Sequence, residues 1–249
     1  VYASVELDAG EVAARLVSLR TDGAWWSSVL SGGYAPSSLE QACDRICADL
    51  PQFYVWAPTR ADERTEDMLR AVVRAAAAAA GGAPPLVIVD YLQRLATGEA
   101  RREAVQKWSG LLHELARAEG DYPGACVMCL SSVARDGYRG ASDSKTKARR
   151  PGPWASTEAL ADASPYTLLG GGKESGEIEY DSPTVLALAA DRPDQGSRHR
   201  ALVRLVKNRF GPLGDLWYVW KPAQGRWTEA DPPFDSHPPS DGRFGPRDE

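Results

Sequence analysis

Short apolar runs alternate with helix-like patterns along the first 130 residues of the chain. Each run is brief and is bounded by polar or turn-forming residues, which is typical of strands. The expected strands cover residues 1–7, 53–57, 86–90 and 126–130. The expected helices begin at Asp8, lie within 23–36, extend from Ser37 to about Leu50, and cover 63–80 and 99–118. Strands that alternate with helices imply crossover connections and therefore a mainly parallel sheet.

Two of the expected helices start with a capping signal. Asp8 with Glu11, and Ser37 with Glu40, have the spacing at which both side chains can accept bonds from free backbone N–H groups. The first strand is expected to end at Glu6, just before the first of these helices.

The pattern changes in the second half of the chain. Residues 135–172 are rich in Gly, Ser, Arg and Lys, which predicts a long mobile loop with a short helix near 156–162. Strands expected at 185–189, 201–206 and 216–220 follow one another closely, which favours antiparallel hairpins. We therefore expect one folded domain over residues 1–230, and a disordered tail over 231–249, where Pro, Asp and Gly are frequent.

Composition narrows the class of protein. The 249 residues are 43% hydrophobic and 25% charged, as in globular proteins, and no apolar run approaches the roughly 18 residues of a membrane span. A net charge of −5 counts against a passive nucleic-acid coat protein, although a locally basic channel remains compatible with it. Cys126 and Cys129 form a CxxC pair, but no second pair or nearby histidine completes a zinc set. Reduced, buried cysteines in a cytoplasmic protein are the expectation.

Two carboxylates mark candidate chemistry. The apolar run Leu86–Val89 leads directly into Asp90, and Glu6 is expected at the end of the first strand. Ligands of parallel sheets bind beyond the carboxyl ends of the strands, so these two side chains could serve as a general base and a Mg²⁺ partner. An apolar strand that ends in Asp is also the Walker B arrangement of nucleotide hydrolases. The alternative is an Asp that only begins the next turn.

Five segments in a fixed order favour the interpretation of Asp90 as part of a nucleotide hydrolase over its interpretation as the start of a turn. They are SVELDAGEVAARL (4–16), DYLQ (90–93), LSSVAR (130–135), KESGEIEYD (173–181) and KNRFGPLG (207–214). Together they resemble the DnaB family of bacterial and phage replicative DNA helicases over roughly residues 1–229. The resemblance implies an α/β fold, namely a RecA-like three-layer sandwich with a mainly parallel central sheet and antiparallel strands at its C-terminal edge.

The resemblance also implies roles in ATP hydrolysis. Glu6 would polarise the attacking water, and Asp90 would organise Mg²⁺ through water. Ser132 would stand where the family commonly has a sensor glutamine, a departure from the pattern. Lys207 and Arg209 would reach the γ-phosphate bound by the neighbouring subunit, because phosphoryl transfer needs positive charge where negative charge spreads. An exposed basic turn is the alternative interpretation of the last pair.

A second set of residues would contact DNA. By resemblance, Lys173, Glu174 and Gly176 lie on a loop that faces a central channel and grips single-stranded DNA through its phosphates. Arg135 and Arg139 belong to the basic loop before it, whose alternative interpretation is a solvated flexible loop. The stretch between the two motifs is longer than the family pattern, which predicts an insertion.

One essential part of the motor is missing from the sequence. The phosphate-cradling loop G-x-x-x-x-G-K-[ST] should lie on a strand and helix before residue 1. The only Gly-Lys pair, Gly172-Lys173, is followed by Glu174 instead of Ser or Thr, so it is not such a loop. A fragment of a longer protein is the simplest account, and a pseudo-ATPase is the other one. The family's N-terminal collar, which helps the ring assemble and bind primase, is missing too.

These expectations combine into a function. The intact protein would be an ATP-dependent DNA helicase that uses ATP and Mg²⁺, forms a hexameric ring, moves along single-stranded DNA and unwinds duplex, with a primase or loader as a further partner. The alternative is a non-catalytic helicase-like module that binds single-stranded nucleic acid or completes a partner subunit's ATP site. A recombinase or circadian-clock type of ATPase shares the core fold, but the last two motifs argue against it.

Overall fold

The structure is a computed structural model of the whole chain. It describes residues 1–21, 26–96, 100–133, 152, 154–169, 181–191, 199–221 and 226–232. Most of the expected loop over 135–172 and nearly all of the expected tail over 231–249 lie outside the described residues, and the short helix expected near 156–162 is present over Thr157–Asp162.

The first half of the chain builds a parallel sheet, as predicted. Its order is β2-β1-β3-β4, with every pair parallel. The strands are β1 (Tyr2–Ser4), β2 (Val55–Trp56), β3 (Leu86–Asp90) and β4 (Cys126–Cys129). The predicted bounds of β3 are confirmed, whereas β1 ends at Ser4 and not at Glu6. The buried Ser4 hydroxyl donates to the carbonyl of Leu7 (2.7 Å) and accepts from its N–H (3.2 Å), which turns the chain out of the sheet.

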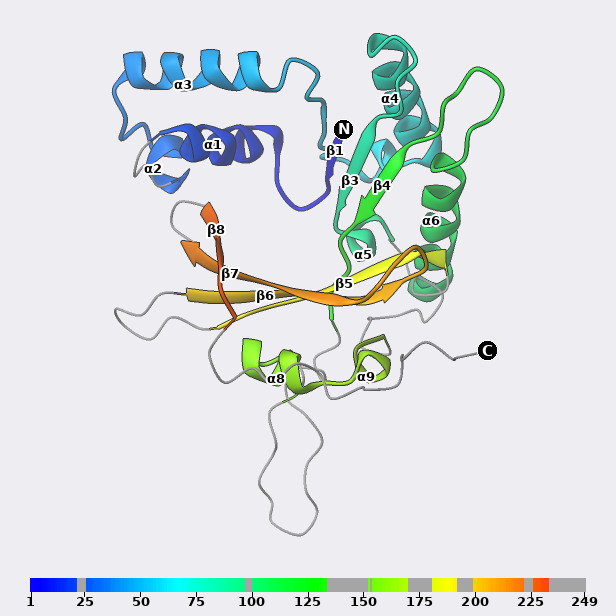
Figure 1. Cartoon of the computed structure of the whole chain (residues 1–249). Helices are drawn as coiled ribbons and strands as arrows, with labels where there is room; N and C mark the ends of the chain where they lie inside the picture. The colour runs from blue at the N-terminus through cyan, green and yellow to red at the C-terminus, as the bar shows by residue number, and fades with distance from the viewer. Residues whose placement is uncertain are drawn as a thin grey trace.

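Helices lie on both sides of this sheet (Figure 1). One side carries α1 (Ala9–Arg20), α2 (Trp26–Leu30) and α3 (Pro36–Asp49), and the other carries α4 (Glu66–Ala79) and α6 (Arg101–Leu115), while α5 (Leu92–Leu95) directly follows β3. A short 3₁₀ helix, η1 (Ala61–Glu63), precedes α4. The main core lies between the sheet and the second helix pair. It includes Leu69 and Val73 of α4, Val87 and Val89 of β3, and Val105, Leu111 and Leu115 of α6.

One of the two predicted helix starts is confirmed. The Asp8–Glu11 capping box opens α1, with both reciprocal bonds present. The Ser37 cap is wrong, because α3 begins at Pro36 with Ala35 as its N-cap and no side-chain bond. Proline is suited to the first turn of a helix, where its fixed φ is already helical and its missing N–H is not needed.

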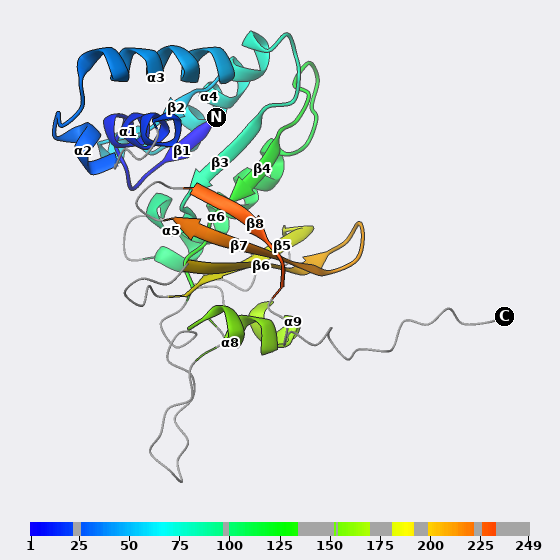
Figure 2. The same ribbon diagram turned by 60° about the vertical axis from the view of Figure 1, so that its left-hand side comes forward.

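The last strands form an antiparallel sheet of their own. Its order is β5-β6-β7-β8, from β5 (Thr184–Ala190), β6 (His199–Asn208), β7 (Gly214–Lys221) and β8 (Arg226–Ala230). The short helices α8 (Thr157–Asp162) and α9 (Pro165–Leu169) cover one face of it, and the parallel-sheet half lies on the side of the other face (Figures 1 and 2). Strand β8 and helices α5 and α9 were not expected from the sequence.

The four cysteines are free. The prediction that the CxxC pair is buried is wrong for Cys126, which is exposed, while Cys129 is half-buried; Cys43 and Cys47 of α3 are exposed. The CxxC pair lies on β4, which ends the row of described strands in its sheet, so one side of the strand faces away from the protein core. Among the described residues no group of three or more His, Cys, Asp or Glu side chains could hold a metal.

Candidate functional site

The site is built on Asp90, the last residue of β3. Its neighbour in the register of the parallel pair is Ser4 of β1, and the Val5 N–H donates to the Asp90 carbonyl at 3.0 Å. The Tyr2 hydroxyl donates to Asp90 Oδ2 at 2.5 Å. Burial, and then the hydrogen bond to Asp90, raise the pKa of Tyr2 well above its usual range. Tyr2 therefore remains a neutral donor to this carboxylate at physiological pH.

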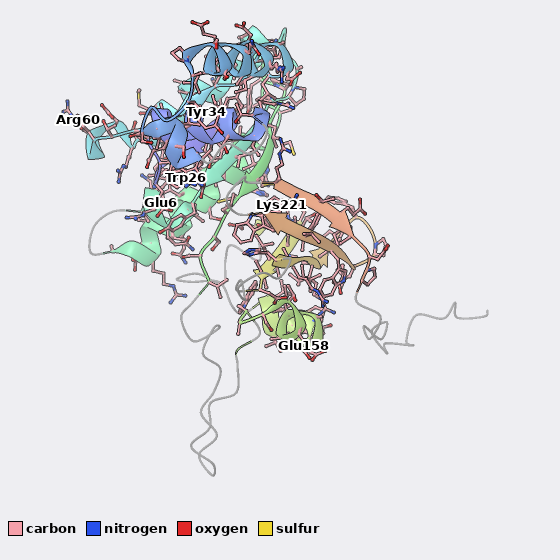
Figure 3. All side chains as sticks on the ribbon, turned by 90° about the vertical axis from the view of Figure 1, so that its left-hand side faces the viewer. Glu6, Trp26, Tyr34, Arg60, Glu158 and Lys221 are labelled. Carbon is pink, nitrogen blue, oxygen red and sulfur yellow. The ribbon has the colours of Figure 1, made fainter. Side chains whose placement is uncertain are left out.

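Glu6 lies on the segment that leads from β1 to α1. Its side chain is exposed and reaches the guanidinium of Arg94 at 3.5 Å, on α5. Arg94 in turn lies over the ring of Tyr91, 5.9 Å from its centroid. Figure 3 looks onto the α1–α3 side of the molecule, where Glu6 is labelled. The parallel pairing of β1 and β3 thus brings Glu6 and Asp90 to the same edge of the sheet, as the sequence predicted.

A buried amide connects this edge with the end of β4. Gln93 is 1% exposed; its Nε2 donates to Ser131 Oγ at 2.7 Å and its Oε1 accepts from the N–H of Ser132 at 3.1 Å. The structure therefore ties Ser132, the expected sensor residue, to the turn that follows Asp90. Gln93 was not singled out as a site residue from the sequence. An uncharged polar side chain immediately after a buried strand was the available signal, because such a group must find partners.

Lys207 and Arg209 lie elsewhere in the molecule. Lys207 is on β6 and pairs with Val185 of β5, and the Arg209 N–H donates to the carbonyl of Pro183 at 3.0 Å. Asn208 fixes the following turn, since its side chain bonds the carbonyl of Pro212 and the N–H of Phe210. In Figures 1 and 2 the β6–β7 turn lies apart from the end of β3, on the side opposite α1. The structure does not bring this pair to Asp90 and Glu6 of the same chain.

The expected DNA-binding residues Lys173, Glu174, Gly176, Arg135 and Arg139 all lie outside the described residues. Asp181, which ends the KESGEIEYD segment, is described. Its Oδ2 accepts from Ser109 Oγ of α6 at 2.8 Å, in a partly buried position. The end of the segment is therefore attached to the helix that follows the Asp90 turn.

The residues present fit a magnesium ion held through water. Mg²⁺ prefers oxygen ligands and keeps several of its waters, so one or two protein carboxylates are sufficient. Asp90 offers such a carboxylate, half-buried at a strand end, and its hydrogen-bond partner Tyr2 is neutral and does not compensate its charge.

No described helix is long and apolar enough to cross a membrane.

A parallel sheet with carboxylates at its strand ends, followed by an antiparallel sheet, is the α/β architecture of the DnaB ATPase domain. A DnaB-like replicative helicase, solved in a study of its interactions with primase, has this fold with a TM-score of 0.65 and 18% identity. That match covers 92% of this chain and 51% of the helicase, so the chain spans about half its length. A second structure, described as an ATPase domain, matches with a TM-score of 0.62 and 16% identity over 92% of this chain and 74% of that one.

Residues 1–229 match the family model of the DnaB-like helicase C-terminal domain, and the chain belongs to this family. The comparison with curated protein sequences returns no match.

Proposed function

We propose that this chain is the motor portion of an ATP-dependent DNA helicase that acts in the cytoplasm, moves along single-stranded DNA and unwinds duplex. One observation supports the proposal: β1 pairs in parallel with β3, Ser4 is the register partner of Asp90, and Glu6 follows two residues after Ser4. The family membership of residues 1–229 supports it.

Each carboxylate then has a role that suits its surroundings. Asp90 would hold Mg²⁺ through water, and Glu6 would accept a proton from the water that attacks the γ-phosphate. Mg²⁺ would neutralise charge that develops on the phosphate oxygens of ATP. Glu6 is exposed and only weakly paired with Arg94, so its side chain can turn toward a water molecule at little cost.

Lys207 and Arg209 serve the site of a neighbouring subunit in a hexameric ring. The β6–β7 turn that follows them lies apart from the end of β3 in Figures 1 and 2, which supports a role in trans, because both carboxylates and both cations are needed around one phosphate group. Lys173, Glu174, Gly176, Arg135 and Arg139 contact single-stranded DNA in this proposal, and a primase or loader binds the assembled ring.

The domain over residues 1–230 lacks its first strand and phosphate loop in this proposal. The sequences CVMCL and VLALAA are continuously apolar, which is typical of strands that are covered on both faces. Yet Met128, Leu130, Leu186 and Leu188 are 43–52% exposed. Among the described strands, β4 pairs only with β3, and β5 pairs only with β6. A further strand and helix that carry the loop would cover these side chains.

The experiment begins with the encoding DNA upstream of Val1. We expect an open reading frame that contains a G-K-[ST] loop, and ATP turnover by the protein expressed from it. Glu6→Gln in that protein should lower turnover at least about a hundredfold while nucleotide binding is retained, because only the proton acceptor is lost. Glu40→Gln, an exposed change on α3, is the matched control. Normal turnover by Glu6→Gln would contradict the proposal.

The second candidate is a non-catalytic module that binds single-stranded nucleic acid or completes a partner's ATP site through Lys207 and Arg209. The position of Lys207 in the antiparallel sheet, paired with Val185 and not with the parallel strands that carry Asp90, favours it. A reading frame that starts at or near Val1, together with single-strand binding that does not depend on ATP, would replace the motor by this module.

A further inference from the structure

Among the described residues, Tyr2 is the one whose side chain hydrogen-bonds the Asp90 carboxylate. Its hydroxyl lies 2.5 Å from Oδ2, and the two residues are 88 positions apart in the sequence. The register explains the contact: Tyr2 pairs with Ile88 and Ser4 pairs with Asp90, so Tyr2 lies on the strand beside β3 and its side chain reaches forward to the strand end.

The phenol ring has little freedom to leave this position. Its backbone N–H donates to the carbonyl of Tyr54 at 2.8 Å, which fixes β1 between β2 and β3. The ring stacks on Phe53 with centroids 6.4 Å apart and planes inclined by 23°. A hydroxyl held in this way directs one oxygen of Asp90, and through it the plane of the carboxylate.

We propose that Tyr2 is a positioning residue for the Mg²⁺ site, which orients the Asp90 carboxylate so that its other oxygen meets a metal-bound water. This inference rests on the proposed function, since it assumes that Asp90 organises Mg²⁺. Residues that hydrogen-bond a metal ligand and orient it contribute about 10- to 100-fold in metal affinity or activity.

The chemistry of the donor suits this role. A lysine or arginine at the same place would neutralise Asp90 and compete with Mg²⁺ for it. A phenol donates one hydrogen bond and carries no charge, so it fixes the geometry while the carboxylate stays anionic. Arg15 of α1 lowers the pKa of Tyr2 through its charge, and Glu6 raises it.

The test uses the full chain, Mn²⁺ in place of Mg²⁺, and no nucleotide. Paramagnetic broadening of the backbone amide signals of residues 89–91 reports metal near Asp90 even when binding is weak. Tyr2→Phe keeps the ring that stacks on Phe53 and removes only the hydroxyl. Tyr54→Phe removes a hydroxyl from the adjacent strand region and is the matched control; Asp90→Asn removes the charged ligand.

We expect wild type and Tyr54→Phe to show the same Mn²⁺ dependence, and Asp90→Asn to lose the broadening. Tyr2→Phe should need about tenfold more Mn²⁺ for the same effect, while its amide spectrum remains that of a folded protein. An unchanged Mn²⁺ dependence in Tyr2→Phe would overturn the positioning role and leave the metal assignment intact. No broadening near Asp90 in wild type would instead overturn the metal assignment, and the inference with it.

Discussion

The parallel and the antiparallel sheet each contain a charged side chain that is at least half-buried, Asp90 and Arg204, and the surroundings of these two side chains differ. In the parallel half, Asp90 is half-buried and is held by the single neutral hydroxyl of Tyr2. In the antiparallel half, Arg204 of β6 is 8% exposed and is surrounded by protein acceptors. Its Nη1 donates to the carbonyls of Leu160, Ala161 and Ala163 at the end of α8, and its Nε lies 3.3 Å from Asp215 Oδ1.

This difference teaches how to separate function from structure among buried charges. Arg204 has protein partners at both Nη1 and Nε, and through Nη1 it caps a helix and fixes it to the sheet. No ion pair to Asp90 is found among the described residues, and Asp90 lies at a strand end where ligands bind. The first arrangement stabilises the fold, and the second leaves a charge available for a ligand.

The largest expected effect comes from Arg204→Met. Removal of the guanidinium leaves Asp215 and the carbonyls of α8 without their partner, which should lower the free energy of unfolding by about 3–5 kcal/mol. Urea denaturation followed by circular dichroism measures this. Arg200→Met, at an exposed position of the same strand, should stay within about 0.5 kcal/mol of wild type. Similar values for the two variants would show that Arg204 is not the structural centre of the antiparallel half.

The next effect compares the two faces of the antiparallel sheet. Leu202 is fully buried under α8 and α9, so Leu202→Ala should reduce stability by about 2–5 kcal/mol. Leu188 of the adjacent strand is 52% exposed on the other face, and Leu188→Ala should change stability by about 0.5 kcal/mol. Thermal denaturation at several protein concentrations measures both. A large, concentration-dependent loss in Leu188→Ala would mean that self-association covers this face in solution.

Gln93 tests whether the parallel half also contains a purely structural polar group. Gln93→Leu leaves the Ser132 N–H and the Ser131 hydroxyl without their buried partner, at a loss of about 1–3 kcal/mol. Hydrogen exchange of the Ser132 amide should become faster in the variant, and Gln41→Leu on the exposed face of α3 should leave it unchanged. Unchanged exchange in Gln93→Leu would exclude a role for Gln93 in holding the β4 end.

The smallest effect concerns the two cysteines of β4. Burial raises the pKa of the Cys129 thiol to about 12 from an ordinary value of 9.0, so its thiolate fraction near pH 8 is about a thousandfold smaller than that of an ordinary thiol. Iodoacetamide at pH 8 should modify the exposed Cys126 and leave Cys129 unmodified until the chain unfolds, as read by mass spectrometry of peptides.

The same shift makes stability fall as pH rises. Between about pH 9 and 12 the unfolded chain releases the Cys129 proton and the folded chain retains it, so this contribution is complete below the lower value and lost toward the upper one. Cys129→Ser should remove this part of the pH dependence. Equal labelling of Cys126 and Cys129 at pH 8 would contradict the assignment of different surroundings to the two thiols.

The features of the fold that the sequence predicted correctly depend on residues that are close together in the chain. The bounds of β3 follow from an apolar run between Pro85 and Asp90, and the start of α1 follows from two side chains three residues apart. The contact between Tyr2 and Asp90 joins residues 88 positions apart, and it depends on a strand register that a single sequence does not specify. Strand β8, RWTEA, is too polar to read as a strand and forms only because β7 offers it an edge.

The sequence predicted which residues form the candidate site, but it did not predict which side chains contact them. Glu6 and Asp90 were expected at one sheet edge, and the structure places them there. The proximity of Arg94 to Glu6, and the amide of Gln93 beneath Ser132, depend on how α5 packs after β3, which the sequence pattern did not reveal. The exposure of Cys126 has the same origin, since it depends on what lies beyond the edge of the sheet.

The short segment that carries Glu6 is fastened at both of its ends. On one side Val5 bonds the backbone of Asp90, and Ser4 holds Leu7 through its hydroxyl. On the other side the Asp8–Glu11 capping box, with bonds of 2.8 and 3.0 Å, locks the chain to the first turn of α1. The backbone of Glu6 is therefore held on one side by the sheet and on the other side by the helix. If α1 tilted together with α2 and α3, which pack on it, the Glu6 carboxylate would move with it. The orientation of these helices therefore sets the position of Glu6.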